Sequence, residues 1–214
     1  MEKLNSDRIC IQVFAKISAA ISHEIKNTLS IINENAGLLN DYAQMAEQTG
    51  GLPLDRILSI TEAIEKQVVR SNIIMKNLNR FAHSGDTSLA QAYLKETLSL
   101  VIELSSRQAA MKEIDITLEC PPDIAVFTHL ISLESLIYLT LLTFYDDCQA
   151  ESSLTVEGIK ENGNISIYFR VEEKNVLLPG RFPDDDQRLL AEQVSGSYHQ
   201  EKNSLCITFP ARFD

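Results

Sequence analysis

Proline is absent from the first 52 residues, and this absence limits the fold of the chain more than any other feature. Within this stretch, one stripe of positions spaced alternately by three and four residues is mostly large and apolar. The stripe consists of Ile11, Phe14, Ser18, Ile21, Ile25, Thr28, Ile32, Asn35, Leu39, Tyr42 and Ala46. This heptad pattern predicts one helix from about Asn5 to Glu47, roughly 64 Å long at about 1.5 Å per residue. A helix of that length is typical of a bundle or a coiled coil.

A second helix is predicted after a short break. Gly50, Gly51 and Pro53 end the first helix, because two glycines followed by proline stop a helix and turn the chain. The next apolar pattern ends near Gly85 and comprises Ile57, Ile60, Ile64, Val68, Ile74, Met75, Leu78 and Phe81. Two long antiparallel helices form a hairpin, which leaves one apolar seam uncovered. Two hairpins that pair into a four-helix bundle would bury this seam, so the sequence predicts a homodimer.

The pattern changes after Thr87, where short apolar alternations predict strands between helices. We expect a short strand and a helix over 89–111, strands over 114–120 and 124–128, and an apolar helix over 130–149. A strand hairpin around 161–163, a short helix over 187–194 and a strand over 204–212 complete the prediction. The strand pairs look largely antiparallel, so the expected fold class is α+β, with an α/β sandwich. The predicted domains are therefore a helical hairpin over 1–85 and a sandwich domain over 86–214.

Charge and cysteine content exclude several functions. The chain has 19 Lys and Arg against 30 Asp and Glu, a net charge of -11, which disfavours binding to nucleic acid. Nine bases and nine acids precede His83, so the acidic excess belongs to the second domain. The four cysteines lie too far apart for a CxxC metal or redox motif and fit a reducing compartment. Neither a signal peptide nor a long apolar run is visible, so we expect a cytoplasmic protein that does not enter a membrane.

The residues around His23 carry the chemistry. With Ile11 at heptad position a, His23 falls at f, on the outer face of the first helix, and Asn27 lies one turn along on that face. Glu24 can accept a proton from one ring nitrogen and leave the other nucleophilic, which suits covalent phosphohistidine chemistry. The alternative is a solvated surface histidine. A zinc metalloprotease is excluded, because the second histidine of the HExxH motif is replaced by Asn27.

The order of these elements resembles the core of a sensor histidine kinase over about residues 18–212. A long helix with the sequence ISHEIKN is followed by a Gly/Pro turn, a second long helix and an α+β domain. The resemblance implies that His23 is the phosphoacceptor, that Glu24 assists proton transfer and that Asn27 orients the water that dephosphorylates a partner. Proline commonly follows this asparagine in the family, whereas Thr28 stands here, so the usual helix kink is left open.

The same resemblance implies an ATPase-type second domain, but the residues that would hold the nucleotide are missing. No asparagine occurs between Asn79 and Asn162, and our alignment places Thr140 and Phe144 where the family has its Mg²⁺-binding asparagines. The stretch over 171–175 lacks the glycines of the adenine-binding Asp-x-Gly-x-Gly element, and no glycine-rich loop follows. We therefore expect a degenerate ATPase-like domain without kinase activity, and no cofactor bound by this chain.

A hairpin with a degenerate ATPase-like domain resembles the standalone phosphorelay histidine phosphotransferases. These proteins take phosphate from one receiver-domain aspartate and pass it to another, with Mg²⁺ bound in the receiver. The implied partner is a response-regulator receiver domain. Two alternatives stay open: a receiver phosphatase that relies on Asn27, and a non-catalytic pseudokinase that binds and sequesters a response regulator.

Three basic residues are candidates for contact with the acidic receiver. If the turn between the long helices centres near Gly50 and Gly51, about residue 78 of the second helix lies level with His23. Lys76 and Arg80 would then flank the histidine, with Lys26 on its own helix. A cationic rim of this kind would steer a receiver toward the histidine, although ordinary solvated side chains give the same pattern.

Overall fold

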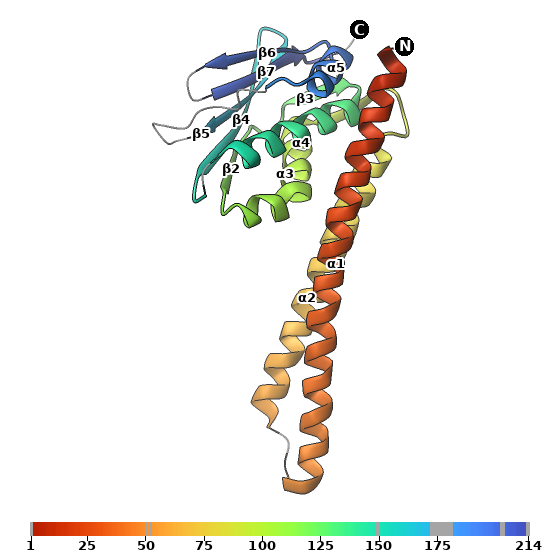
Figure 1. Ribbon diagram of the computed structural model, residues 1–214, viewed down its shortest axis with the longest axis vertical. Coiled ribbons are helices and arrows are strands. Elements are labelled where there is room, and N and C mark those ends of the chain that lie inside the picture. Colours follow the sequence, from red (N-terminus) through yellow and green to blue (C-terminus); the bar gives the residue numbers. More distant parts are fainter. Residues whose placement is uncertain are drawn as a thin grey trace. The chain divides into compact units, whose positions relative to one another are not determined.

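The computed structural model describes residues 2–49, 51, 53–148, 150–171, 182–201 and 204–212. It is an α+β structure, as predicted, and its elements are shown in Figure 1. The helices are α1 (Glu2–Thr49), α2 (Leu54–His83), α3 (Leu94–Met111), α4 (Leu130–Asp147) and α5 (Asp185–Gln193). The strands are β1 (Ala90–Tyr93), β2 (Asp115–Glu119), β3 (Ala125–Thr128), β4 (Ser153–Glu161), β5 (Asn164–Val171), β6 (Ser197–Glu201) and β7 (Ser204–Pro210).

Contacts divide the chain into two compact units. One is the helical hairpin Ser18–Asn79, and the other joins Met1–Ile17 to Arg80–Asp214. The first turns of α1 and the end of α2 thus pack within the α/β unit. Such a division describes contacts and not independent folding, so the domain limits 1–85 and 86–214 stay a prediction.

The hairpin unit buries the stripe that the heptad pattern predicts. From Ser18 to Ala46 every predicted stripe position is buried or half-buried, with Ile21 and Thr28 the most enclosed. On α2 the matching positions include Ile57, Ile60 and Ile74, whereas Val68 and Met75 are 44% and 43% exposed. The two long helices therefore pack along a heptad seam, and some apolar side chains of the hairpin stay uncovered.

The heptad prediction is wrong for the first turns of α1. Ile11 is 69% exposed and Phe14 is 38% exposed, whereas Ile9, Val13 and Ile17 are buried. The reason is that this segment packs in the α/β unit, where the thiol of Cys10 lies 4.0 Å from the hydroxyl of Ser132 on α4. The buried face of the helix is rotated there toward the α/β unit, although the Phe14 ring still stacks on Phe81 of α2 with centroids 6.3 Å apart.

The α/β unit is a mixed sheet covered on one face by helices. The five strands follow the order β2-β4-β5-β7-β6, with β2 and β4 parallel and the other neighbours antiparallel. A separate antiparallel pair joins β1 to β3. Inward side chains such as Val156, Ile167 and Phe169 are fully buried against α3 and α4, while alternate residues of the same strands are half-exposed. The largely antiparallel pairing was predicted correctly.

One strand was not predicted from the sequence pattern. Strand β6 has the sequence SYHQE, in which the residues 197–200 are all exposed. An edge strand without buried apolar side chains shows no alternation, so nothing in its sequence predicts it. No helix in the described part of the chain is both long and apolar enough to cross a membrane.

Candidate functional site

His23 lies on the solvent-exposed side of α1, in the hairpin unit. Asn27 is also exposed and stands four residues further on, so both side chains leave the same face of the helix. The neighbouring Ser22 donates its hydroxyl hydrogen to the carbonyl of Ser18 at 2.7 Å, which keeps this polar side chain on its own helix. His23 therefore presents its imidazole to solvent, as position f of the heptad predicts.

Thr28, at the position where the resemblance would place a proline, makes a buried polar contact. Helix α1 is continuous from Glu2 to Thr49, and Thr28 is only 2% exposed. Its hydroxyl donates to the carbonyl of Ile25 at 2.8 Å and lies 2.8 Å from the hydroxyl of Ser71 on α2. The residue after Asn27 thus joins the two helices of the hairpin five residues, or about one and a half turns, after His23.

Glu24 is held by a residue that sequence reasoning missed. The carboxylate oxygen Oε1 of Glu24 accepts from Nη2 of Arg70 at 2.7 Å and from Nε of the same guanidinium at 3.3 Å. The carboxylate is largely enclosed, whereas Arg70 is more exposed. With Ile57 of α2 at heptad position a, Glu24 and Arg70 both occupy position g of their helices, where antiparallel neighbours meet. This pairing therefore follows once the register between the helices is known. Arg70 fixes the carboxylate next to His23.

The contacts between α1 and α2 also show which residues of α2 lie beside His23 along the axis of the hairpin. Glu24 meets Arg70 and Thr28 meets Ser71, so His23 lies level with about residues 71–76 of α2 and not with residue 78. Lys76 stands within this range, and Lys26 follows His23 by less than one turn; both are exposed. Together with Arg70, which is paired with Glu24, they are basic side chains that the hairpin offers near the histidine.

Arg80 belongs to the α/β unit, where it has an acidic partner. Its Nη2 atom donates to Oε2 of Glu96 on α3 at 2.9 Å. The guanidinium therefore has an acidic partner in an exposed ion pair near the C-terminal end of α2. Its predicted role in receiver contact stays a prediction.

The two positions aligned with nucleotide-binding asparagines face the core. Thr140 and Phe144 on α4 are both 0% exposed. The hydroxyl of Thr140 donates to the carbonyl of Leu136 at 2.7 Å, and the ring of Phe144 stacks on Phe169 of β5 with centroids 5.8 Å apart. Neither side chain offers an oxygen to a ligand, because one is bonded within its helix and the other is apolar.

A half-buried face of α4 is closed by a contact with α5. Thr143 lies on this face, and its hydroxyl accepts from the amide Nε2 of Gln187 at 3.0 Å. Gln187 is also part of a capping box, in which Asp184 accepts from the Gln187 backbone N–H at 2.8 Å and the Gln187 side chain accepts from the Asp184 backbone N–H at 2.8 Å. Both polar ends of Gln187 are thus used within the protein. The glycine-free stretch over 171–175 lies, after Val171, outside the described residues.

Glu134 is a buried carboxyl that the sequence analysis did not single out. It lies in the first turns of α4, is 1% exposed, and its Oε2 has no hydrogen-bond partner among the described residues. Burial raises the pKa of Glu134 from 4.5 to about 8, although the Ser84 hydroxyl and the charge of Arg80 act in the opposite direction. A glutamate in an apolar run gives no sequence signal of this kind. Among the described residues, no group of three or more His, Cys, Asp or Glu side chains is arranged to hold a metal ion.

The fold is shared with histidine kinases of known structure. A catalytic domain of histidine kinase ThkA in a nucleotide-free form covers 60% of this chain and 100% of its own length, with a TM-score of 0.50 and 9% identity. Histidine kinase AdeS of Acinetobacter baumannii covers 88% of this chain and 98% of its own length, with a TM-score of 0.50 and 10% identity. At such identities the likeness establishes the fold and no activity: the chain has the fold of a histidine kinase core. No protein-family model and no curated protein matches the chain.

Proposed function

We propose that this protein is a histidine phosphotransferase of a two-component phosphorelay, which carries phosphate on His23 to or from the aspartate of a response-regulator receiver domain. The observation that carries the proposal is the exposed His23, one turn from Asn27, on a hairpin joined to an α/β unit of histidine kinase fold. The imidazole is accessible to a second protein, as transfer between two proteins requires.

The chemistry is a displacement at phosphorus. A lone pair of a ring nitrogen of neutral His23 attacks the phosphorus of an aspartyl phosphate, the N–P bond forms, and the P–O bond to the acyl oxygen breaks. The electron pair of that bond leaves with the receiver carboxylate, and the proton on the other ring nitrogen goes to a base. Glu24 is the nearest carboxylate in sequence, and its contact with Arg70 limits where it points. The reverse reaction passes the phosphoryl group to a receiver.

An ATP-independent reaction is consistent with the residues that the α/β unit has in place of nucleotide-binding asparagines. The acyl phosphate supplies the energy, so no nucleotide is required. The buried Thr140 and Phe144 and the contact between Thr143 and Gln187 support this part of the proposal, since these residues leave no asparagine-like ligand on α4. In this proposal Mg²⁺ belongs to the receiver.

Phosphate labelling tests the proposal. The full chain is mixed with purified receiver domains that carry ³²P from acetyl phosphate, and in parallel with γ-³²P-ATP. We expect an acid-labile label on this chain from at least one receiver, lost in His23→Ala and kept in Asn27→Ala, and no label from ATP. Receiver dephosphorylation that survives His23→Ala but fails in Asn27→Ala would instead identify a phosphatase. Binding of a receiver without either reaction would identify a sequestering pseudokinase.

A further inference from the structure

Strand β2 lies at one end of the five-stranded sheet. Among the described residues it pairs with β4 alone. Its exposed residues Asp115, Thr117 and Glu119 alternate with the half-buried Ile116 and Leu118. A strand in this position offers unpaired backbone N–H and C=O groups on its free side, which can pair with a strand of another chain.

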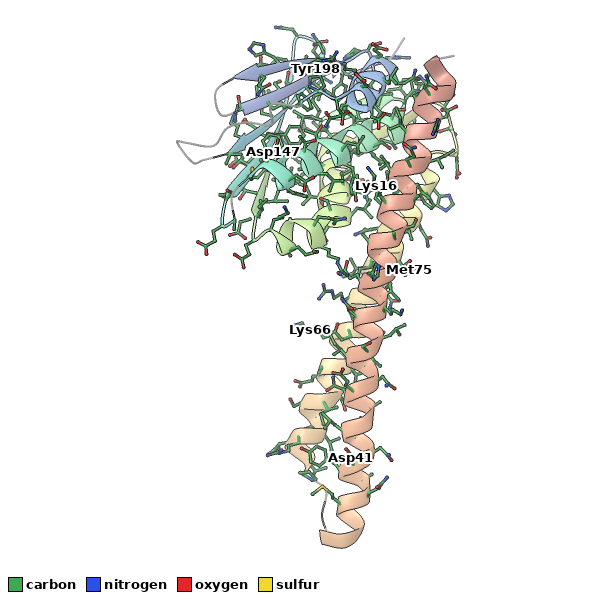
Figure 2. The ribbon with its side chains drawn as sticks, viewed as in Figure 1. Lys16, Asp41, Lys66, Met75, Asp147 and Tyr198 are labelled. Carbon is green, nitrogen blue, oxygen red and sulfur yellow. The ribbon has the colours of Figure 1, made fainter. Side chains whose placement is uncertain are left out.

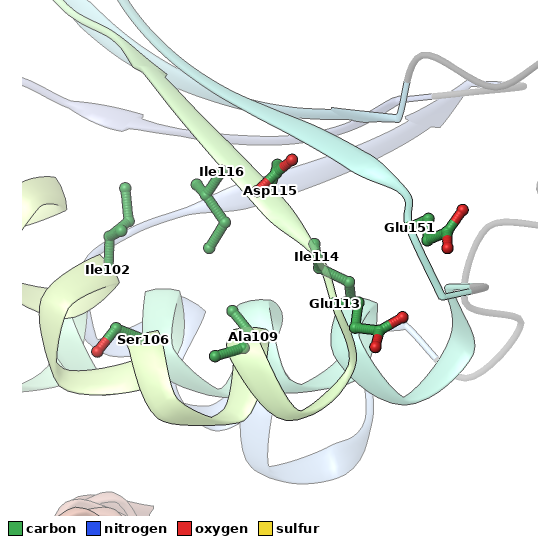
Figure 3. A pocket seen from close by; sticks show the side chains of 9 residues that line it. Ile102, Ser106, Ala109, Glu113, Ile114, Asp115, Ile116 and Glu151 are labelled. Atoms are coloured by element: carbon green, nitrogen blue, oxygen red, sulfur yellow. The ribbon is translucent and has the colours of Figure 1, made fainter.

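A hollow of about 570 Å³ lies between this strand and α3. Figure 3 shows it with α3 below and β2 above, and with the side chains of Ile102, Ala109 and Ile116 in the space between them. The lining also includes Ser106, Ala110, Ile114 and three acids, Glu113, Asp115 and Glu151. Because alanine side chains are short, the α3 side of the hollow leaves room for an apolar side chain from outside.

The mouth of the hollow is acidic. Glu113 and Asp115 flank the start of β2, and Glu151 stands in the turn before β4. The carboxyl end of α3 adds the negative end of its helix dipole. The adjacent base, Lys112, is directed to Asp146, with its Nζ atom 3.8 Å from Oδ1.

The acidic character continues to the other end of β2. A second hollow of about 590 Å³ is lined there by Glu119 and Asp123, with Lys160 as its basic member. Carboxylates thus stand at both ends of the unpaired edge. The chain as a whole carries a net charge of -11, so the occupant that this edge favours electrostatically is a basic one.

We propose that the free edge of β2 and the hollow beside it form a docking site for an extended segment of another protein, in which basic residues flank an apolar residue. The segment adds a strand to the sheet next to β2, and its apolar side chain enters the hollow beside the half-buried Ile102 and Ile116. Its basic side chains meet Glu113 and Asp115. A second copy of β2 is a poor occupant, because Asp115 and Glu119 would then face like charges. The site is independent of His23 and of phosphotransfer.

Peptide selection and a set of matched peptides test this site. A library of short random peptides displayed on phage is selected against the full chain, and we expect enrichment of peptides in which Lys or Arg flanks an apolar residue. For the best peptide, hydrogen exchange of the backbone amides over 115–119 should slow on binding. A version with N-methyl groups on every internal backbone nitrogen keeps the side-chain charges but has no N–H group to donate to β2 from either edge, so it should bind at least about tenfold more weakly.

Two charge variants of the protein complete the test. The variant E113N/D115N/E151N removes the acids at the mouth of the hollow. It should keep the fold, because asparagine tolerates the positive φ of 56° at Glu113 and 64° at Glu151. We expect at least about tenfold weaker peptide binding. The control E62Q/E65Q/E103Q changes the net charge equally at exposed positions outside the hollow and should bind like the unchanged chain.

Four results would overturn the proposal. They are a selection that enriches no peptides or only acidic ones, unchanged exchange over 115–119, equal binding of the N-methylated peptide, and equal loss of binding in both charge variants. None of them bears on the labelling of His23, so the failure of this site and the failure of phosphotransfer are separate results.

Discussion

Glu134 makes the stability of the α/β unit depend on pH. In the unfolded chain this carboxyl ionises with a pKa near 4.5, whereas the folded protein holds its pKa at about 8, so the folded state binds one more proton between these values. Stability contributed by the neutral carboxyl is present below pH 4.5 and is lost as the pH rises toward 8. The loss is on the order of 5 kcal/mol for a shift of this size.

The substitution Glu134→Gln tests this linkage, because a glutamine cannot ionise. We expect the variant to gain stability relative to the unchanged protein as the pH rises from 5 to 9, measured by urea unfolding at each pH. Glu192→Gln, at an exposed position of α5, is the matched control and should leave the pH dependence unchanged. Parallel stability curves for Glu134→Gln and the unchanged protein would show that the carboxyl is solvated in the folded state.

Residue-level features differ in how far the sequence predicts them. The outward direction of His23 follows from the heptad register, because position f is opposite to the seam. The partner of Glu24 does not follow, since Arg70 is 46 residues away and the register between two helices depends on the length and path of their connection. The burial of Thr140 and Glu134 also escapes prediction, because nearly every residue of the apolar helix α4 is enclosed and no face stands out.

At the scale of elements, the contact between Thr28 and Ser71 ties α1 to α2 close to His23. The two hydroxyls lie 2.8 Å apart, and Thr28 is buried. Removal of one hydroxyl therefore leaves the other without this hydrogen-bond partner. We expect Thr28→Val to lower the free energy of unfolding by about 1 kcal/mol. The double variant Thr28→Val, Ser71→Ala should lose less than the sum of the single variants in a double-mutant cycle. Strictly additive losses would mean that the two hydroxyls do not interact.

Helix α5 depends on the capping box at its start. Asp184 satisfies the backbone N–H of Gln187, and Asp184→Ala removes this bond at a cost of about 1 kcal/mol. Gln187→Ala should cost more, because it also leaves Thr143 on α4 without its amide partner. Thermal unfolding monitored by circular dichroism measures both. Asp185→Ala, next in the same turn, is the control for the loss of a negative charge at the helix start. A smaller effect of Gln187→Ala than of Asp184→Ala would contradict the contact between α4 and α5.

The long helices were easier to predict than their environment. Absence of proline and a heptad pattern specify α1 almost to its ends, since both are local properties. The pattern cannot say which neighbour a helix has, and this is why Ile11 was assigned to the buried face although it is exposed. The edge strand β6 was missed because its polar sequence is compatible with a loop as well as with a strand.

At the scale of the whole molecule, the hairpin unit has two flanks of different composition. On one flank, Arg56 and Arg70 of α2 accompany Glu24 of α1. This flank also exposes the apolar α1 residues Ile31, Leu38 and Met45. The other flank has no charged residue at the e positions of either helix over the hairpin. It presents Ser22, Leu29, Ala36 and Ala43 from α1 and Leu54, Thr61, Val68 and Met75 from α2. An exposed surface without charged residues is typical of an interface, so we assign the predicted homodimer to this uncharged flank.

Charge placed on the uncharged flank should therefore separate the dimer. Val68 and Met75 are exposed on α2, and Figure 2 labels Met75, so lysine at both positions leaves the seam between α1 and α2 untouched. We expect V68K/M75K to keep its helix content by circular dichroism but to sediment as a monomer at concentrations where the unchanged chain is a dimer. Two buried lysines per subunit would have to be desolvated without partners.

Leu38 is 47% exposed on the charged flank, and Leu38→Lys is the control that should stay dimeric. If the Leu38→Lys variant dissociates and V68K/M75K does not, the dimer uses the charged flank. If the unchanged chain is monomeric at all concentrations, the predicted four-helix bundle does not form.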